Sequence, residues 1–214
     1  MIIDCFPFFN ELDLLEARLN ELKDVVDVFV LSEATHTFTN NPKPLYFKDN
    51  QDRYAEFADR IYHVVIDTYP GLNRSDPWSM DYGQKQFGLD AAIEKYNPCG
   101  DDIILLGDAD EISKASTLKK LQGEEWDSVS AEMTLFYHYI NCKSKRPWRH
   151  PTWIRTRGKH IIQSETRGGK NRDRDRIVHD AGWHFSYLGS AEDTLYKINS
   201  WAHQEKNIPP YNTI

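Results

Sequence analysis

Two aspartates with one residue between them, Asp108 and Asp110, end the most apolar strand that the sequence predicts, in residues 103–111 (IILLGDADE). In open sheets of alternating strands and helices, ligands bind at the carboxyl ends of the strands. Two carboxylates at that edge are ligands that Mg²⁺ or Mn²⁺ prefers, with positions left for phosphate oxygens. The pair therefore predicts a divalent-metal site for a phosphorylated ligand, although acids at such a turn also serve simply to cap a helix.

His184 is the second candidate ligand, in the segment 182–186 (GWHFS). A histidine between aromatic residues is usually a hydrogen-bonded core residue. A metal that carboxylates hold against a diphosphate nevertheless often takes one imidazole as well. We therefore assign His184 as the third metal ligand and expect Trp183 to pack beside a sugar.

Further polar groups follow the other predicted strands. Pro7 and Glu11 lie where the first strand meets the first helix, whose N-terminus favours an anionic or polar ligand. Asn10 is placed to cap that helix. Glu33 and Asp67 end the second and third strands, and Asp67 is placed to accept the imide N–H of a uracil ring.

Positive charge for a diphosphate has several sources, because ammonium and guanidinium groups bind phosphates. The candidates are Lys85, Arg146, Arg149, Arg155 and Arg157, of which Lys85 and Arg157 are assigned to cofactor binding.

These residues need a scaffold, and the first half of the chain alternates between strand and helix. Strands are predicted at residues 2–9, 26–32, 61–67 and within 101–111, with helices after residue 10 and at 51–60 and 81–96. Longer strands are predicted at 128–142, 152–163 and 177–188, before a last helix at 191–204. This order predicts an α/β fold in which a Rossmann-like, mostly parallel sheet carries helices on both faces, beside a smaller mixed sheet.

We expect one domain of residues 1–214, in which residues 1–112 bind a nucleotide-sugar and residues 113–214 bind an acceptor. A net charge of −7 argues against a general nucleic-acid binder. Residues 143–176 nevertheless hold twelve Lys or Arg against three acids, which suits a phosphate-bearing ligand as well as a solvated loop.

No apolar run approaches the roughly 20 residues that span a bilayer. The start of the chain lacks the basic region of a signal peptide. Cys5, Cys99 and Cys142 are scattered and are expected to be free thiols. These features predict a cytoplasmic protein without a membrane span.

Several separated segments resemble glycosyltransferase family 17. They are residues 4–22 (DCFPFFNELDLLEARLNEL), 28–47 (VFVLSEATHTFTNNPKPLYF), 101–112 (DDIILLGDADEI) and 182–189 (GWHFSYLG), in that order. The resemblance implies a GT-A fold, a UDP-sugar donor with UDP-N-acetylglucosamine first, a divalent ion (Mn²⁺ or Mg²⁺) and inversion at the anomeric carbon. The resemblance implies that Asp108 and Asp110 are metal ligands. The role of His184 as the third ligand comes only from an analogy with other GT-A enzymes.

Inversion requires a single displacement, in which a carboxylate takes the proton of the acceptor hydroxyl. The metal ligands lie on the leaving-group side, so the base is expected elsewhere. The candidates are Asp180 first, because it leads into the segment of His184, then Glu165, and then Glu132.

The predicted function is transfer of a sugar, N-acetylglucosamine first, from a UDP-sugar to a glycan or glycoconjugate acceptor. One alternative is a metal-dependent phosphohydrolase or nucleotidyltransferase that uses the same two aspartates. The other is a non-catalytic module that binds a sugar nucleotide.

Overall fold

The computed structural model describes residues 1–157, 161 and 176–213. The strands are β1 (Ile2–Phe8), β2 (Val28–Ala34), β3 (Ile61–Ile66), β4 (Ile103–Leu106), β5 (Glu111–Ser113), β6 (Ser128–Tyr137), β7 (Thr152–Arg155) and β8 (Ile177–Ser186). The α-helices are α1 (Leu12–Leu22), α2 (Tyr46–Asp49), α3 (Pro77–Tyr96), α4 (Ala115–Gln122) and α6 (Ala191–Ser200). The 3-10 helices among these residues are η1 (Gln51–Arg60) and η3 (Gln204–Lys206).

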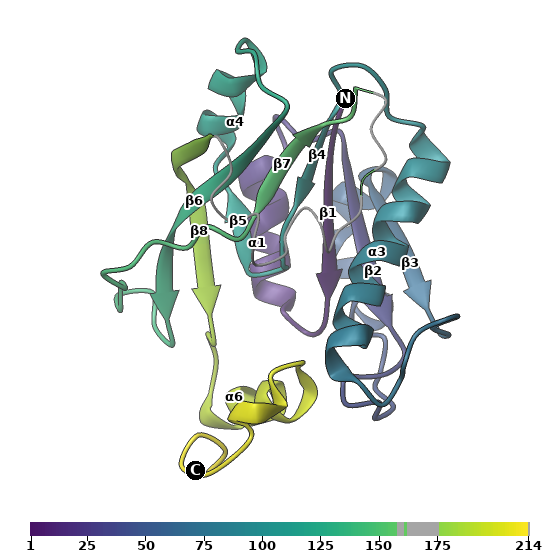
Figure 1. The fold of residues 1–214 in the computed structure, drawn as a ribbon, viewed down its shortest axis with the longest axis vertical. Coiled ribbons are helices and arrows are strands. Elements are labelled where there is room, and N and C mark those ends of the chain that lie inside the picture. The colour runs from purple at the N-terminus through teal and green to yellow at the C-terminus, as the bar shows by residue number, and fades with distance from the viewer. Residues whose placement is uncertain (158–160, 162–175, 214) are drawn as a thin grey trace.

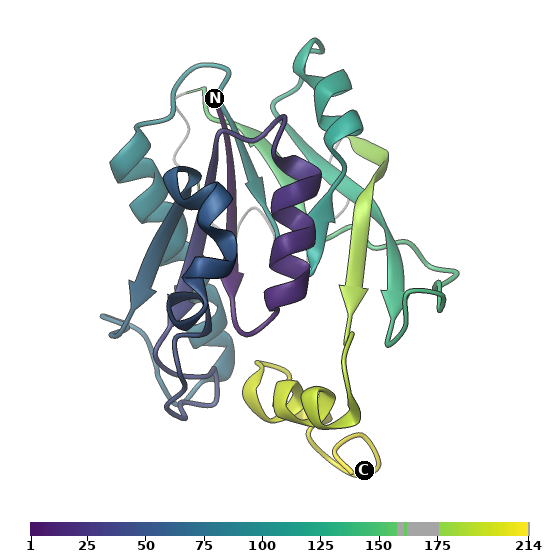
Figure 2. The ribbon, with the colours of Figure 1, turned by 180° about the vertical axis from the view of Figure 1, so that it is seen from behind.

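In the part of the chain that the structure describes, eight strands form one sheet in the order β3-β2-β1-β4-β7-β6-β8-β5. Pairing is parallel from β3 to β4 and between β6 and β8, and antiparallel at the other three junctions. Helix α1 covers one face and α3 the other (Figure 1 and Figure 2). The predicted α/β architecture is thereby confirmed. The mixed half continues the parallel half through β4 and β7, and the division into a nucleotide-sugar half and an acceptor half stays a prediction.

The central strands are apolar on both faces because helices cover both faces. Along β1, Phe6 and Phe8 belong to the core under α1, whereas Ile3 and Cys5 belong to the core under α3. The direction and register of β1 are given by its parallel pairing with β2 on one side and β4 on the other. Its carboxyl end therefore has a defined position beside that of β4.

Several helices differ from their prediction: α6 ends at Ser200 and not at residue 204, and α4 was not predicted. Helix α3 begins at Pro77, four residues before the predicted start at residue 81. Proline suits the first turn of a helix, and Asp76 caps this one by accepting a hydrogen bond from Trp78 N–H at 3.1 Å. Residues 51–60 form a 3-10 helix instead of an α-helix.

A β-bulge interrupts the pairing of β6 with β8. Ala131 and Met133 of β6 are two residues apart, whereas their partners on β8, Val178 and Gly182, are four residues apart. Asp180 lies in the bulge with a φ of 52°. Bulges bend a strand and change the direction of its side chains. This one brings the end of β8 alongside β5, next to the predicted metal-binding aspartates.

We expect Gly182→Ala to destabilise the fold by about 2–4 kcal/mol. Gly182 has a φ of 154°, and an added Cβ would lie 2.1 Å from the carbonyl oxygen of Ile112. Gly123→Ala is the matched control, because nothing lies within 4 Å of a Cβ there and its φ is −86°. Urea unfolding would measure both variants, and equal midpoints would contradict the close approach at Gly182.

No helix within residues 1–157, 161 and 176–213 combines the length and the apolar character needed to cross a membrane. The three cysteines are free thiols, as predicted. Burial raises the pKa of the Cys5 thiol above its ordinary value. Cys5 is therefore an unreactive core residue under α3.

Candidate active site

The carboxyl ends of β1 and β4 lie side by side because these strands are parallel neighbours. The segments that follow them, residues 7–11 and 108–110, therefore meet. A cleft of about 350 Å³ lies between these segments, α3 and α6. The structure brings six of the predicted site residues together in its lining: Pro7, Glu11, Lys85, Asp108, Asp110 and His184.

A lysine holds each of the two aspartates. Lys85 Nζ lies 3.0 Å from Asp108 Oδ1 and 2.9 Å from Asp81 Oδ1. Lys197 Nζ, on α6, lies 2.9 Å from Asp110 Oδ2. The lysines offset the repulsion that neighbouring carboxylates would otherwise suffer.

Asp110 and Lys197 form an ionised pair. Burial would raise the pKa of the Asp110 carboxyl, but Lys197 and His184 hold it well below its usual range. Burial would likewise lower the pKa of the Lys197 ammonium, but Asp110 and Glu11 raise it above its ordinary value. Glu11 contributes from 3.7 Å. The cleft therefore carries fixed charges of both signs at neutral pH.

Arg18 of α1 holds the turn that carries the aspartates. Its side chain is 1 % exposed, and its Nε and Nη2 donate to the two oxygens of Asp4 at 2.7 and 2.6 Å. Its Nη1 donates to the carbonyl oxygens of Asp108 and Glu111 at 2.8 and 3.0 Å. One guanidinium thus satisfies a buried acid and fixes the backbone of the turn.

Glu111 fixes the same turn through its side chain. Its Oε2 accepts a hydrogen bond from Asp108 N–H at 2.6 Å, and its Oε1 accepts one from Trp148 Nε1–H at 2.5 Å. Trp148 packs on His184 and on His150, with ring centroids 4.3 and 3.9 Å apart. The imidazole of His184 is thereby oriented within the cleft.

Trp183, which was expected to pack beside a sugar, does not line this cleft. Successive residues of a strand point to opposite faces, and His184 takes the cleft side of β8. Trp183 therefore lies outside the cleft lining, with Lys114 Nζ 5.8 Å from its ring centre. Trp148 is the tryptophan that contacts His184.

Glu11 replaces Asn10 as the capping residue of α1, and no side chain caps the first turn. Glu11 Oε2 instead accepts hydrogen bonds from the backbone N–H groups of Phe9 and Asn10, both at 3.1 Å. The carboxylate is held in the cleft by these bonds and faces Lys197. Asn10 was expected to cap the helix, and its backbone carbonyl instead accepts from Leu12 N–H.

A divalent ion fits part of the predicted ligand set. Asp110 Oδ1 and His184 Nε2 lie 3.4 Å apart, near the roughly 3 Å between neighbouring ligands of an octahedral ion with bonds of about 2.1 Å. Asp108 pairs with Lys85, and the residues that the structure describes include no ready-made group of three ligands. One or two carboxylates completed by substrate phosphates are a usual way to bind such ions. The oxygen and imidazole donors present suit that mode.

Another part of the cleft lining is aromatic. Trp78 and Trp201 both pack on His203, with ring centroids 4.4 and 4.7 Å away. Tyr187 packs on Trp201 at 5.5 Å. Tyr82 completes this lining and is 42 % exposed. Such rings offer apolar faces to a sugar and polar edges to its hydroxyl groups.

Glu33 ends β2 as predicted but lies beneath the cleft lining. It is fully buried, accepts a hydrogen bond from Phe47 N–H at 3.0 Å and bonds to His63 Nε2 at 2.9 Å. Its other neighbour is Lys43 Nζ at 3.8 Å, and Lys43 lines the cleft. Burial lowers the pKa of Lys43, and Glu33 opposes that effect. Glu33 therefore acts on the cleft through Lys43.

Asp67 also reaches the cleft indirectly. Its Oδ1 accepts the hydroxyl proton of Thr35 at 2.9 Å, and Thr35 Oγ1 lies 2.9 Å from His36 Nδ1. Because the one hydroxyl proton goes to Asp67, the imidazole nitrogen donates to Thr35. In the neutral tautomer that donates from Nδ1, the Nε2 of His36, which lines the cleft, is an acceptor.

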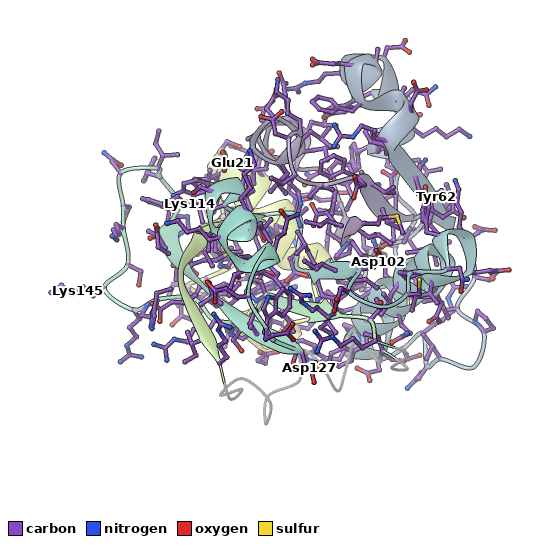
Figure 3. All side chains as sticks on the ribbon, turned by 90° about the horizontal axis from the view of Figure 1, so that it is seen from above. Glu21, Tyr62, Asp102, Lys114, Asp127 and Lys145 are labelled. Atoms are coloured by element: carbon purple, nitrogen blue, oxygen red, sulfur yellow. The ribbon has the colours of Figure 1, made fainter. Side chains whose placement is uncertain are left out.

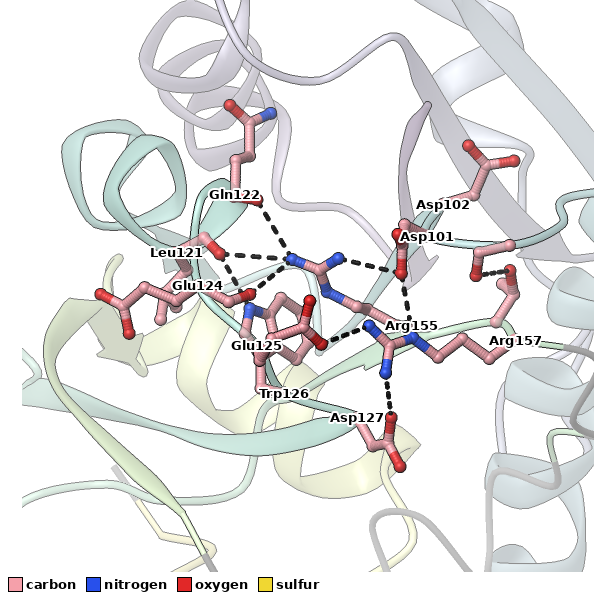
Figure 4. Close-up of polar contacts among 12 residues, drawn as sticks. Asp101, Asp102, Leu121, Gln122, Glu124, Glu125, Trp126, Asp127, Arg155 and Arg157 are labelled. Atoms are coloured by element: carbon pink, nitrogen blue, oxygen red, sulfur yellow. Dashed lines mark hydrogen bonds and ion pairs between the residues drawn. The ribbon is translucent and has the colours of Figure 1, made fainter.

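The structure does not bring Arg157 to the cleft. Arg157 binds Asp101, Glu125 and Asp127 at 2.9, 2.9 and 3.0 Å, at the amino end of β4 (Figure 4). Arg155 lies beside it and donates to backbone carbonyl oxygens at the end of α4. Figure 3, viewed from this end of the sheet, labels Asp127 there. Acids compensate both arginines far from the carboxyl end of β4.

Two of the three predicted bases, Asp180 and Glu132, do not line the cleft. The Asp180 side chain is 75 % exposed and binds Lys114 Nζ at 2.5 Å, because the bulge turns it outward. Glu132 binds Arg149 Nε at 2.7 Å. Glu165 lies outside the described residues. A base must contact the acceptor hydroxyl, so the position of Asp180 does not support that role.

Four side chains around the aspartates were missed from the sequence. They are Arg18, Glu111, Trp148 and Lys197. Glu111 follows the two aspartates directly, and Arg18 is a charged residue within the apolar stripe of α1. Both could therefore have been identified from the neighbouring sequence. Lys197 is 87 residues from Asp110, so no such local signal exists for it.

A model of glycosyltransferase family 17 matches residues 1–209 of the chain. The chain is 32 % identical to proteins named β-1,4-mannosyl-glycoprotein 4-β-N-acetylglucosaminyltransferase from Rattus norvegicus and Homo sapiens. The matches cover 93 % of this chain and 42 % and 43 % of those proteins, so the chain spans less than half the length of these relatives. Among solved structures, a mannosyltransferase from Pyrobaculum calidifontis, in complex with GDP-Man and Mn²⁺, is similar with a TM-score of 0.47 and 13 % identity, over 92 % of this chain and 59 % of that one.

Proposed function

The chain belongs to glycosyltransferase family 17, and from that membership we propose that its cleft binds a UDP-sugar with a divalent ion and transfers the sugar, with inversion, to a glycan acceptor. We put UDP-N-acetylglucosamine first, because the mammalian relatives are named N-acetylglucosaminyltransferases. The observation that carries the proposal is the meeting of Asp110, His184 and two lysines in one cleft at the carboxyl ends of parallel strands.

In this proposal, some charged groups of the cleft bind the divalent ion and others bind the diphosphate. Asp108, Asp110 and His184 would hold the divalent ion, which neutralises the charge that grows on the diphosphate as it leaves. Lys85 and Lys197 supply further positive charge on the same side of the sugar. The aromatic lining offers faces for sugar rings.

The nucleoside is proposed to lie toward Lys43 and His36. Glu33 pairs with Lys43, and Asp67 positions His36 through the hydroxyl of Thr35. His36 Nε2 is an acceptor for the N–H of a uracil ring, a task that the sequence alone assigned to Asp67. Residues 1–112 remain the proposed nucleotide-sugar half and residues 113–214 the proposed acceptor half.

The first test is thermal unfolding with a panel of nucleotide-sugars, each with and without Mn²⁺. A ligand at a hundred times its Kd stabilises a protein by about 2.7 kcal/mol, which raises Tm by about 5–10 °C in a chain of this size. We expect that shift for a UDP-sugar with Mn²⁺ and not for the matched GDP-sugar. No shift with any nucleotide-sugar at millimolar concentration would overturn the proposal.

Product analysis then separates the alternatives. Transfer gives UDP and a lengthened acceptor in equal amounts. Release of inorganic phosphate would favour the phosphohydrolase, and binding without turnover would favour the non-catalytic module. The cytoplasmic location stays a prediction.

A further inference from the structure

Lys197 lies on α6, and contacts of α6 with the rest of the fold place this lysine at the cleft. Helix α6 begins with a capping box between Ser190 and Asp193. Tyr196, the residue before Lys197, packs on Phe9 with ring centroids 5.1 Å apart. These contacts fix the backbone of Lys197 beside the cleft, while its side chain has rotatable bonds of its own.

Lys197 already pairs with one carboxylate oxygen of Asp110, the predicted metal ligand. Its Nζ lies 2.9 Å from Asp110 Oδ2, while His184 Nε2 lies 3.4 Å from Asp110 Oδ1. Both oxygens of this carboxylate thus have partners before any ligand arrives. A divalent ion that binds Asp110 must share it with an ammonium, and like charges at such distances repel.

We propose that Lys197 is a diphosphate-binding residue that exchanges partners: it neutralises Asp110 in the free protein and binds a phosphate oxygen when Asp110 binds the ion. This inference rests on the proposed function. The negative charge of the diphosphate removes the repulsion between ion and ammonium, so ion and nucleotide bind together. Lys197 then opposes the ion alone but favours the ion with nucleotide.

Lys85 is less suited than Lys197 to exchange a carboxylate partner for a phosphate. It lies 2.9 Å from Asp81 as well as 3.0 Å from Asp108. Its charge therefore keeps a carboxylate partner when Asp108 turns to an ion. The second acid near Lys197 is Glu11, at the longer distance of 3.7 Å.

The test is Lys197→Met, measured by two titrations of the purified chain. In the first, Mn²⁺ alone is added and the free ion is followed by electron paramagnetic resonance. In the second, UDP is added at saturating Mn²⁺ and binding is followed by calorimetry. We expect Mn²⁺ alone to bind more tightly and UDP to bind more weakly, each by about tenfold, within the range of coupling between sites.

Three further variants keep this result interpretable. Lys197→Gln is also neutral but keeps a hydrogen-bond donor for Asp110. It should show the same tighter binding of Mn²⁺ and weaker binding of UDP, and it replaces the methionine variant if that variant folds poorly. Lys197→Arg keeps the charge and should leave both affinities near the wild type. Lys119→Met, on the exposed side of α4, is the matched control for removal of one lysine charge.

The two changes of opposite sign distinguish this role from a structural one, which would weaken both affinities. Unchanged or weaker binding of Mn²⁺ alone in both neutral variants would overturn the exchange. Unchanged UDP affinity would overturn the phosphate contact while leaving the proposed function in place. Failure of the wild-type chain to bind UDP at all would overturn both.

Discussion

Asp110→Asn is expected to lower sugar transfer by at least about a hundredfold, since loss of even a partner that only orients a metal ligand costs about 10–100-fold. Asparagine keeps the shape of the side chain but removes the charge that binds Lys197 and would bind the ion. The measurement is the initial rate of acceptor glycosylation at saturating UDP-sugar. Because the ion is bound more weakly, a higher Mn²⁺ concentration should restore part of the rate.

Asp59→Asn is the matched control, because it makes the same chemical change at an exposed position of η1. It should keep the wild-type rate. A wild-type rate for Asp110→Asn would remove Asp110 from the ligands of the ion. Asp180→Asn, made in parallel, tests the predicted base: its outward position leads us to expect most of the rate, and loss of transfer with unchanged UDP binding would restore that prediction.

Arg18→Leu is expected to destabilise the fold by about 3–5 kcal/mol, the usual result when one partner of a buried ion pair is removed. Asp4 is fully buried and would keep an uncompensated charge. The loss is a large part of the roughly 5–15 kcal/mol that holds a typical domain together. Urea unfolding followed by tryptophan fluorescence measures it. Arg53→Leu is the control, because its pairs with Asp13 and Glu16 are solvent-exposed and should cost less than about 1 kcal/mol.

The double variant Asp4→Leu/Arg18→Leu separates the two tasks of this arginine. Removal of both charges together avoids the uncompensated acid, so most of the stability should return. The hydrogen bonds from Arg18 to the carbonyl oxygens of Asp108 and Glu111 remain lost. We therefore expect sugar transfer to stay low in a stable protein. Recovery of both properties would show that the turn needs no support from α1.

The architecture and part of the site followed from the sequence because their signals are local. Apolar strands that alternate with helices predict a parallel sheet, and residues directly after such strands share one edge of it. Pro7, Glu11, Asp108 and Asp110 were placed by that rule, and the structure brings them together.

The remaining residues depended on contacts that sequence patterns do not carry. Asp180 was chosen because it precedes His184 by four residues, but a bulge that depends on pairing with β6 turns it outward. Arg157 was chosen for its charge, but acids about 30 and 56 residues away compensate it. Lys197 reaches Asp110 only because α6 folds back over the strand ends. Local rules predict the edge of the sheet, and tertiary pairing decides which charges reach it.

The order of the strands has a consequence for how the chain acquires its cleft during folding. The centre of the sheet pairs Ile2 with Ile103 and Ile103 with Arg155, so its neighbours are distant in sequence. Closing such long loops costs entropy before any pairing repays it, and folding slows as the sequence separation of contacts grows. Strand β1 cannot complete its pairing until β4 has been synthesised, about 100 residues later. Lys197 adds a group from α6, so a ribosome-bound chain gains the cleft charges described above only after α6 has also left the ribosome.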